Sequence, residues 1–180
     1  MPEIETARLR LRGFTTDDLN DLSAIRADPD VMRYIGGSPD SFEQVQSALN
    51  NILLHWEQHG FGRWAVADRE DGGLIGWCGL SYLEDTGEVE IGYGIAKPYW
   101  GKGLTSEAAA ASVRYGFEEL ALGRIVAVAL PDNTASRRVM GKLGMRYVKV
   151  AHHYNAEVVY YEISREEYQA DNSFYLLHRT

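Results

Sequence analysis

A glycine-rich segment at residues 88–108, EVEIGYGIAKPYWGKGLTSEA, constrains the fold more than any other part of the chain. Its first half alternates like a strand, and Gly101 and Gly103 stand directly before an amphipathic helix. Glycines let the backbone approach a ligand, and a helix start has unpaired N–H groups and the positive end of the helix dipole. The segment therefore predicts a strand, a loop and a helix that bind an anion on the amides of residues 101–106.

Three kinds of glycine loop compete for this segment. A Walker-type phosphate loop needs a glycine at position 96 and Ser or Thr at position 103, where the chain has Ala96 and Gly103. A dinucleotide loop needs Gly or Ala at position 106, where Ser106 is a poor match, and an acidic residue after the next strand. A pyrophosphate cradle of different geometry remains, together with the alternative that the glycines serve only a strand-to-helix turn.

Hydrophobic periodicity predicts a single α+β domain over residues 1–180, with a C-terminal tail at 171–180. The expected elements, in chain order, are a strand at 7–14, helices at 16–28 and 41–59, strands at 61–69, 74–84 and 86–95, a helix at 103–121, a strand at 124–130, a helix at 133–144, and strands at 145–154 and 157–164. This order predicts a central mixed, mostly antiparallel sheet of about seven strands flanked by helices, with one parallel step.

The composition argues against several classes of protein. A formal net charge of −8, without a basic patch and interleaved aromatics, argues against nucleic-acid binding. No apolar run approaches the ~20 residues that a membrane span needs. Cys78 is the only cysteine, which fits a cytoplasmic protein. The histidines lack the spacing of metal ligands, so we expect no metal site.

The loop at residues 100–105, WGKGLT, resembles the Gln/Arg-x-x-Gly-x-Gly/Ala loop of the GNAT superfamily of acetyl-coenzyme A-dependent N-acetyltransferases. Gly103 matches this pattern, whereas Trp100 and Thr105 depart from it; YWGKG followed by EA is typical of the RimJ/RimL-like branch. That branch includes enzymes that acetylate the N-termini of ribosomal proteins. Three further blocks resemble it in the same order: TARLRLRGFTTDDL, GLIGWCGL and NTASRRVMGKLGM.

The resemblance implies a GNAT-type sheet that splays at the coenzyme site, with a bulge in the strand at 86–95 whose backbone pairs with the pantetheine arm. It implies acetyl-CoA as cosubstrate and direct attack by a primary amine in a ternary complex. The acceptor would be a protein N-terminus, such as that of a ribosomal protein, or a small-molecule amine. The coenzyme-binding residues that it implies are Tyr93, Gly94, Ile95, Gly101, Lys102, Gly103, Leu104, Thr105, Ser106, Asn133 and Ser136.

Strand alternation places Glu88, Glu90, Gly92 and Gly94 on one face, with two carboxylates followed by empty space. By resemblance, Glu90 is the catalytic base that accepts the proton of the amine, directly or through water. The alternative is that the paired carboxylates form only a solvated face.

The predicted helix at 133–144 carries the second candidate catalytic residue. Asn133 caps the helix and, by resemblance, also contacts the pantetheine chain. By resemblance Ser136 lies near the thioester sulfur, where a hydroxyl would donate a hydrogen bond to the leaving thiolate. Many relatives have a tyrosine further along this helix that acts as the general acid, but the corresponding residue here is Met140.

This departure leaves open a second class of function, a non-catalytic acyl-CoA-binding sensor. The helices at 16–28 and 41–59 are expected to shape the acceptor groove. The apolar cluster at residues 174–177 predicts that the tail docks, either on the body or on a second subunit, so a homodimer also remains open.

Overall fold

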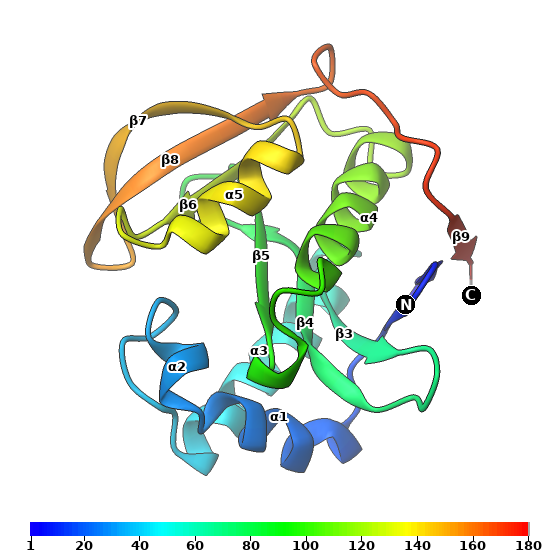
Figure 1. Cartoon of the computed structure of the whole chain (residues 1–180), viewed down its shortest axis with the longest axis vertical. Coiled ribbons are helices and arrows are strands. Elements are labelled where there is room, and N and C mark those ends of the chain that lie inside the picture. The colour runs from blue at the N-terminus through cyan, green and yellow to red at the C-terminus, as the bar shows by residue number, and fades with distance from the viewer. Residues whose placement is uncertain (180) are drawn as a thin grey trace.

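The computed structural model describes residues 1–179, which form a sheet with helices on both faces (Figure 1). The elements are β1 (Glu3–Thr6), β2 (Leu9–Arg12), η1 (Thr16–Asp18), α1 (Leu19–Arg26), α2 (Pro29–Met32), α3 (Phe42–His59), β3 (Arg63–Asp68), β4 (Leu74–Tyr82), β5 (Val89–Ile95), η2 (Lys97–Tyr99), α4 (Leu104–Glu118), β6 (Arg124–Ala129), α5 (Thr134–Lys142), β7 (Arg146–His153), β8 (Ala156–Ser164) and β9 (Tyr175–His178). The strands lie in the order β7-β8-β6-β5-β4-β3-β2-β1-β9.

The predicted α+β class and the mixed, mostly antiparallel sheet are confirmed, but the sheet has nine strands rather than about seven. The predicted strand at 7–14 is instead two strands, because the Thr6 hydroxyl accepts the N–H of Leu9 (3.0 Å) and closes a corner between them. The first predicted helix ends as expected before Pro29, since α1 stops at Arg26, but a short second helix follows it directly. Asp28 accepts the N–H of Asp30 (2.8 Å) and caps α2, which starts at Pro29.

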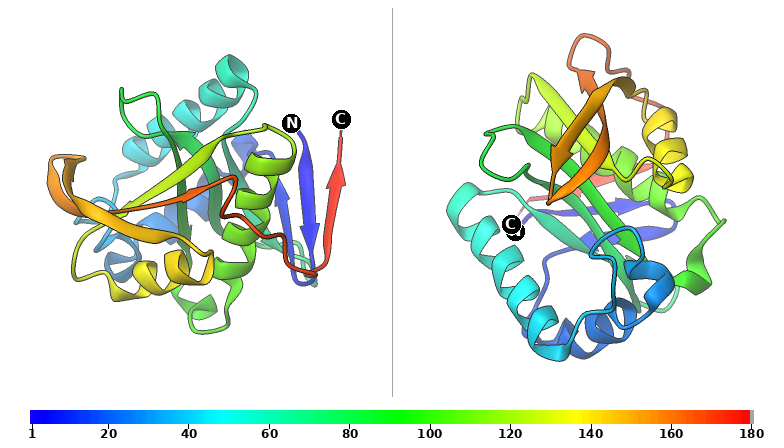
Figure 2. Two further views of the ribbon diagram at one scale, coloured as in Figure 1. Left: turned by 90° about the horizontal axis from the view of Figure 1, so that it is seen from above. Right: turned by 90° about the vertical axis from the view of Figure 1, so that its left-hand side faces the viewer.

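The helices divide between the two faces of the sheet (Figure 2). Helices α1 and α3 pack on one face, through a buried cluster that includes Leu22, Leu49 and Trp77. Helix α4 packs on the other face through Ala109 and Phe117, and α5 lies beside it. The two faces therefore differ in which helices enclose them, and β5 runs between the two sets (Figure 1).

The sheet opens between β5 and β6. These two strands are parallel, and their only ladder pair among the described residues is Glu90 with Val126. On its other side β5 pairs with β4 continuously from Val89 to Ile95. The expected splay is therefore present, but the bulge expected in this strand is wrong, because the β4–β5 register runs without a shift.

The glycine face of β5 is not empty. A Cβ on Gly94 would lie 2.3 Å from the Trp77 ring, and a Cβ on Gly92 would lie 2.9 Å from the Arg63 guanidinium. The expectation of free space on this face is therefore wrong. The space above these glycines is filled by the Trp77 indole of β4 and the Arg63 guanidinium of β3 rather than left for a ligand.

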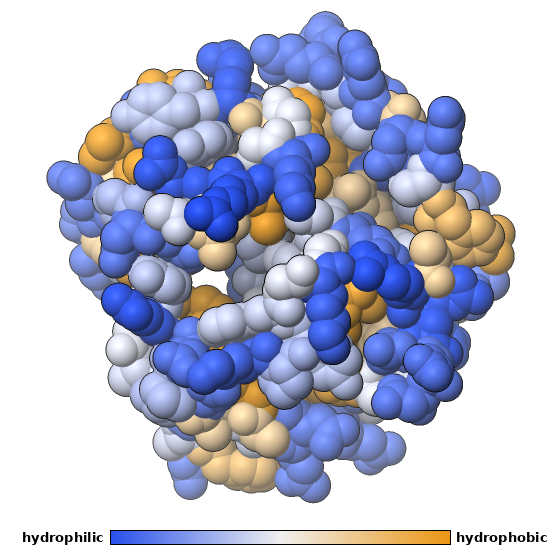
Figure 3. Space-filling model, viewed as in Figure 1, coloured by the Kyte–Doolittle hydropathy of each residue, from blue (hydrophilic) through white to orange (hydrophobic). Residues whose placement is uncertain are grey.

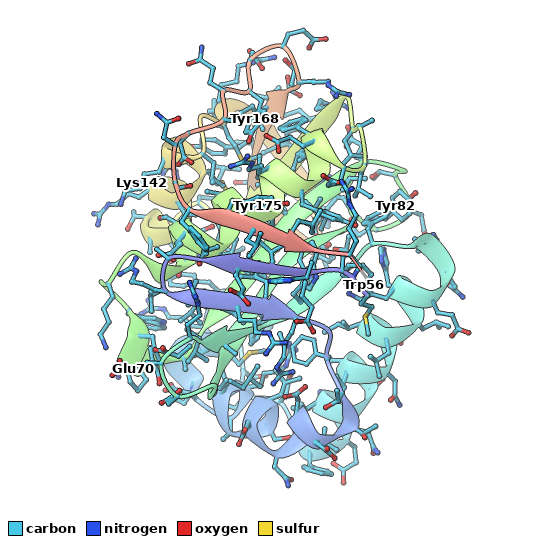
Figure 4. All side chains as sticks on the ribbon, turned by 90° about the vertical axis from the view of Figure 1, so that its right-hand side faces the viewer. Trp56, Glu70, Tyr82, Lys142, Tyr168 and Tyr175 are labelled. Carbon is cyan, nitrogen blue, oxygen red and sulfur yellow. The ribbon has the colours of Figure 1, made fainter. Side chains whose placement is uncertain are left out.

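The C-terminal tail docks on the body of the domain, as one of the two alternatives predicted. Its strand β9 pairs antiparallel with β1, joining Tyr175 to Thr6. Figure 4 shows Tyr175 on this edge strand, and the Arg114 guanidinium of α4 lies 4.4 Å from the centre of its ring. Thr180, the last residue of the predicted tail, lies outside the described residues. Across residues 1–179, none of the helices combines the length and apolar character of a membrane span.

We expect Gly94→Ala to lower the free energy of unfolding by about 2–3 kcal/mol, because the new methyl group overlaps the buried Trp77 ring. Urea denaturation monitored by tryptophan fluorescence would measure this loss. Gly123→Ala is the matched control, since a Cβ there meets nothing within 4 Å. Equal stability of the two variants would contradict the packing described for β5.

Candidate active site

The glycine loop leaves the start of α4 open. Gly101 and Gly103 have φ values of 74° and 78°, in the left-handed region that favours glycine. Gly103 is the N-cap of α4 and has no side chain to accept the first amides of the helix. The N–H groups of Leu104, Thr105 and Ser106 have no partner within the helix, so the predicted cradle has the backbone it requires.

The loop is held from the corner between β1 and β2. Arg8 donates to the carbonyl of Lys102 (2.8 Å) and forms an ion pair with Glu107 (2.6 Å). The same carboxylate accepts the Thr6 hydroxyl (2.7 Å). Glu107 in the first turn of α4 is therefore neutralised by Arg8. The role of Arg8 was not anticipated from the sequence, because it depends on a contact between distant segments.

The backbone of β5 faces the opening with free polar groups. The N–H of Ala96 donates to the carbonyl of Ile75 in β4. In an antiparallel pair, alternate residues bond to the same neighbouring strand, so the N–H and C=O of Tyr93 and Ile95 point away from β4 and toward the opening beside β6. The Ile95 carbonyl is occupied by Trp100 Nε1 (2.6 Å). Within residues 1–179, the Tyr93 N–H and C=O and the Ile95 N–H remain unpaired at the edge of an open groove. These three peptide groups can form hydrogen bonds with an extended ligand.

Glu90 lies at the point where the strands part and is 4% exposed. Its Oε1 accepts hydrogen bonds from Arg63 Nη2 (2.9 Å) and the Tyr154 hydroxyl (2.5 Å). Its Oε2 makes no hydrogen bond with residues 1–179. Burial raises the pKa of Glu90, although the Arg63 charge and the Tyr154 hydrogen bond act in the opposite direction. The solvated-face alternative is therefore wrong for Glu90.

Glu88 has a different environment. It forms an ion pair with Arg124 and accepts the Tyr160 hydroxyl (2.9 Å) at the edge of β6 and β8. Its carboxylate therefore links strands, which suits a structural role and makes Glu88 a suitable control for Glu90.

Helix α5 brings its candidate residues together on the opposite face of the sheet. Asn133 accepts the N–H of Ser136 (3.1 Å), as predicted for the N-cap. The hydroxyl groups of Ser136 and Tyr93 are hydrogen-bonded at 2.9 Å. Met140 is buried and 1% exposed, so it only packs.

The phenol of Tyr93 was not anticipated, although its backbone was expected to line the coenzyme. Strand alternation places its side chain on the face opposite Glu90, but the sequence does not show that α5 lies on that face. Burial is the main cause that raises the pKa of Tyr93. The phenol therefore keeps its proton at neutral pH and is a hydrogen-bond donor at a place where α5 carries no tyrosine.

The surface is hollowed over β5, between the part formed by α5 and the part formed by α2 (Figure 3). A second hollow of about 440 Å³ begins at Ser106 and runs along α4 to Lys142, where the tail forms its other wall. No group of three His, Cys, Asp or Glu side chains within the described part of the chain is arranged to hold a metal ion.

The candidate site therefore combines a buried carboxylate on one face of the sheet, two hydrogen-bonded hydroxyl groups on the other face and, between them, peptide groups of β5 that the described residues leave unpaired. Residues 8–146 match the acetyltransferase (GNAT) domain model, so the chain belongs to this family and is an acetyl-CoA-dependent N-acetyltransferase. The N-acetyltransferase YoaA of Bacillus subtilis is 36% identical over 156 residues, which are 85% of this chain and 88% of YoaA.

Solved structures agree with this assignment. A GNAT-family acetyltransferase from Bacillus anthracis is 33% identical with a TM-score of 0.77, covering 92% of this chain and 99% of its own. An acetyltransferase from Agrobacterium tumefaciens is 26% identical with a TM-score of 0.82, covering 91% and 94%. The predicted family is confirmed, and the relatives are consistent with its RimJ/RimL-like branch.

We expect Arg63→Met to lower the free energy of unfolding by about 3 kcal/mol at pH 7, because it leaves the buried Glu90 carboxylate without its charge partner. This value is at the low end for buried pairs, since Arg63 is partly exposed. The pKa of Glu90 is already raised in the folded state and rises further without Arg63. The cost therefore applies to the ionised form and shrinks as the pH falls toward the pKa of an unfolded glutamate.

Urea denaturation at pH 7 and near pH 4.5 would measure both effects. Arg10→Met is the matched control, because the Arg10–Glu3 pair lies on the surface and its loss costs about 0.5 kcal/mol or less. A loss that is the same at the two pH values would contradict the assignment of the cost to the ionised Glu90.

Proposed function

We propose that this enzyme transfers the acetyl group of acetyl-CoA to a primary amine by direct attack in a ternary complex. One observation carries the proposal: β5 leaves β6 directly after Glu90, with this buried carboxylate on one face and the Tyr93 and Ser136 hydroxyls on the other. Amine and coenzyme then approach from opposite faces and meet where the strands part.

The coenzyme would lie along β5 and the start of α4. Its diphosphate would accept hydrogen bonds from the amides of residues 101–106, where Lys102 adds a positive charge. The pantetheine arm would pair with the free backbone groups of Tyr93 and Ile95, beside Gly94, in the manner of an added strand. Asn133 would support the arm from α5.

The reaction then needs one proton acceptor and one donor. The amine nitrogen attacks the thioester carbon while Glu90 Oε2, directly or through a water molecule, takes the proton that the nitrogen loses. A β5 amide stabilises the oxyanion of the tetrahedral intermediate. The C–S bond breaks as the carbonyl re-forms, and the thiolate accepts a hydrogen bond from the Ser136–Tyr93 pair. The thiolate then gains a proton from water, and Glu90 releases to water the proton that it took from the amine. The products are the N-acetylamine and CoA.

The acceptor is proposed only as a primary amine. Two structures that share the fold are named as a ribosomal-protein-S5-alanine acetyltransferase from Vibrio fischeri, 19% identical, and a spermidine N-acetyltransferase from Vibrio cholerae in complex with CoA and spermine, 21% identical. A protein N-terminus, including that of a ribosomal protein, and a small amine are therefore both retained. The cytoplasmic location and the homodimer stay predictions.

The sensor alternative rested on Met140 standing where relatives have a tyrosine. Tyr93 supplies a phenol to the same helix from β5, through its 2.9 Å contact with Ser136. The feature that favoured a non-catalytic protein therefore no longer favours it.

We expect Glu90→Gln to lower kcat at pH 7 by about 100-fold, because it removes the proton acceptor, and to leave the CoA dissociation constant unchanged. Calorimetric titration with CoA would measure binding. Thiol release from acetyl-CoA with a panel of amines and N-terminal peptides would measure turnover. Glu88→Gln is the matched control and should keep its activity. An unchanged pH–rate profile in Glu90→Gln would remove Glu90 from the mechanism, and failure of the wild type to bind CoA would overturn the coenzyme site.

We expect Tyr93→Phe and Ser136→Ala each to reduce kcat by about tenfold, the effect of one lost hydrogen bond to a charged atom in the transition state. Because the two hydroxyls act as one unit, the double variant should lose much less than the product of the two single losses. Tyr161→Phe is the control, since it removes a hydroxyl that contacts Arg137 of α5 (3.3 Å). Multiplicative losses, or full activity in both single variants, would argue against a shared donor.

A further inference from the structure

The turn between β7 and β8 has an unusual backbone. Tyr154 and Asn155 are its two central residues, and both have positive φ values, 52° and 59°. Two-residue hairpin turns of this kind favour Asn and Gly, and a bulky side chain in the left-handed region costs about 1 kcal/mol. A tyrosine here is a local cost that the surrounding contacts must offset.

A third residue with a positive φ contacts this turn. Glu84, in the turn between β4 and β5, has a φ of 45°. One of its carboxylate oxygens accepts the N–H of Tyr154 (3.0 Å), and the other pairs with His153 Nδ1 (2.8 Å). Of the four non-glycine residues with positive φ among residues 1–179, three therefore meet at this point.

Burial of the tyrosine ring does not explain the arrangement, because Tyr154 remains 49% exposed. Its hydroxyl, however, reaches inward and donates to Glu90 Oε1 (2.5 Å). This contact joins the β6–β8–β7 half of the sheet to β5 across the opening, where the ladder has a single pair. The hydroxyl contact is therefore one of the contacts that offset the backbone cost, together with those of Glu84.

We propose that Tyr154 is a positioning residue for Glu90: the hairpin tip, residues 153–155, is clasped by Glu84 and fixes Oε1, so that Oε2 faces the incoming amine. This inference rests on the proposed role of Glu90 as the base. Oε1 is shared by Tyr154 and Arg63, which come from opposite sides of the splay, and the carboxylate cannot rotate without losing both hydrogen bonds.

The same contacts set the protonation of the carboxylate. Arg63 from β3, and Tyr154 and His153 from the tip, face Glu90, while Glu84 faces the tip from the opposite side. Burial raises the pKa of Glu90, and the Tyr154 hydrogen bond is one of the causes that lower it. Removal of that hydroxyl would therefore raise the pKa further and leave less of the enzyme in the basic form near neutral pH.

The test compares Tyr154→Phe, Glu84→Gln and the control Tyr147→Phe, which removes an exposed hydroxyl from β7 in the same hairpin. Carbon-13 NMR of protein labelled at the glutamate carboxyl carbons gives the titration midpoint of Glu90 without any acceptor, with the signal assigned through Glu90→Gln. The profile of kcat/KM against pH is then measured with an amine that the wild type acetylates.

We expect Tyr154→Phe to shift the Glu90 midpoint and the acidic limb of kcat/KM to higher pH. The loss of kcat/KM should be about three- to tenfold near neutrality, the effect of one hydrogen bond, and should largely disappear at alkaline pH. Glu84→Gln weakens the contacts that hold the hairpin tip, so it should shift the Glu90 midpoint and the acidic limb in the same direction. Tyr147→Phe should leave the midpoint and the acidic limb unchanged.

An unchanged Glu90 midpoint in Tyr154→Phe, or an equal loss of kcat/KM at every pH, would overturn the positioning role, because a merely structural defect does not follow the titration of Glu90. Failure of the proposed function has a different signature. In that case Glu90→Gln would keep the wild-type pH–rate profile, whatever the NMR midpoint of Tyr154→Phe.

Discussion

The parting of β5 from β6 is the constraint on which the rest of the site depends. Strand β6 pairs with β8 on its other edge, and β5 pairs with β4. Beyond the pair of Glu90 and Val126, β5 and β6 form no further ladder pairs with each other in the described part of the chain. Unpaired peptide groups inside a domain are costly unless water or a ligand satisfies them. The pantetheine arm of acetyl-CoA would satisfy these peptide groups, because the amide groups of the arm resemble those of a missing strand. The binding groove is thus a gap in the hydrogen-bonded ladder, and the starts of α4 and α5 lie around it (Figure 1).

Local signals predicted much of this fold. Ser41 and Gly60 bound α3, and Asn133 caps α5, because caps and periodicity act over a few residues. Contacts that join distant segments were not predictable in this way. Arg63 lies 27 residues from Glu90, and Tyr154 lies 64 residues from it. Alternation placed Glu90 on a face, but the register of β3 against β4, and the position of the β7–β8 turn, decide which side chains that face meets.

The Arg63–Glu90 pair is better explained by chemistry than by stability. A buried ion pair seldom stabilises a fold more than apolar residues of the same volume, since both ions lose their hydration. An arginine nevertheless suits a base, because it keeps its proton at any pH at which the enzyme works and so never competes for the proton of the amine. Its guanidinium lies over Gly92, where any other residue would displace it. In the proposed mechanism, the glycines of β5 would therefore make room for the partner of the base as well as for the coenzyme.

In the proposed mechanism, the two faces of the sheet separate the proton acceptor, Glu90, from the hydrogen-bond donors to the leaving thiolate. On the α1–α3 face, burial raises the pKa of Glu90, which strengthens a carboxylate as a base. On the α4–α5 face, burial raises the pKa of Tyr93, which keeps a phenol as a donor. Adjacent residues of a strand point to opposite faces. Residues 90 and 93 are three positions apart, an odd number, so their side chains lie on different faces of the sheet. The backbone between them is where the thioester carbonyl would bind, so the base acts on the nitrogen, the donor acts on the sulfur, and neither can exchange a proton directly with the other.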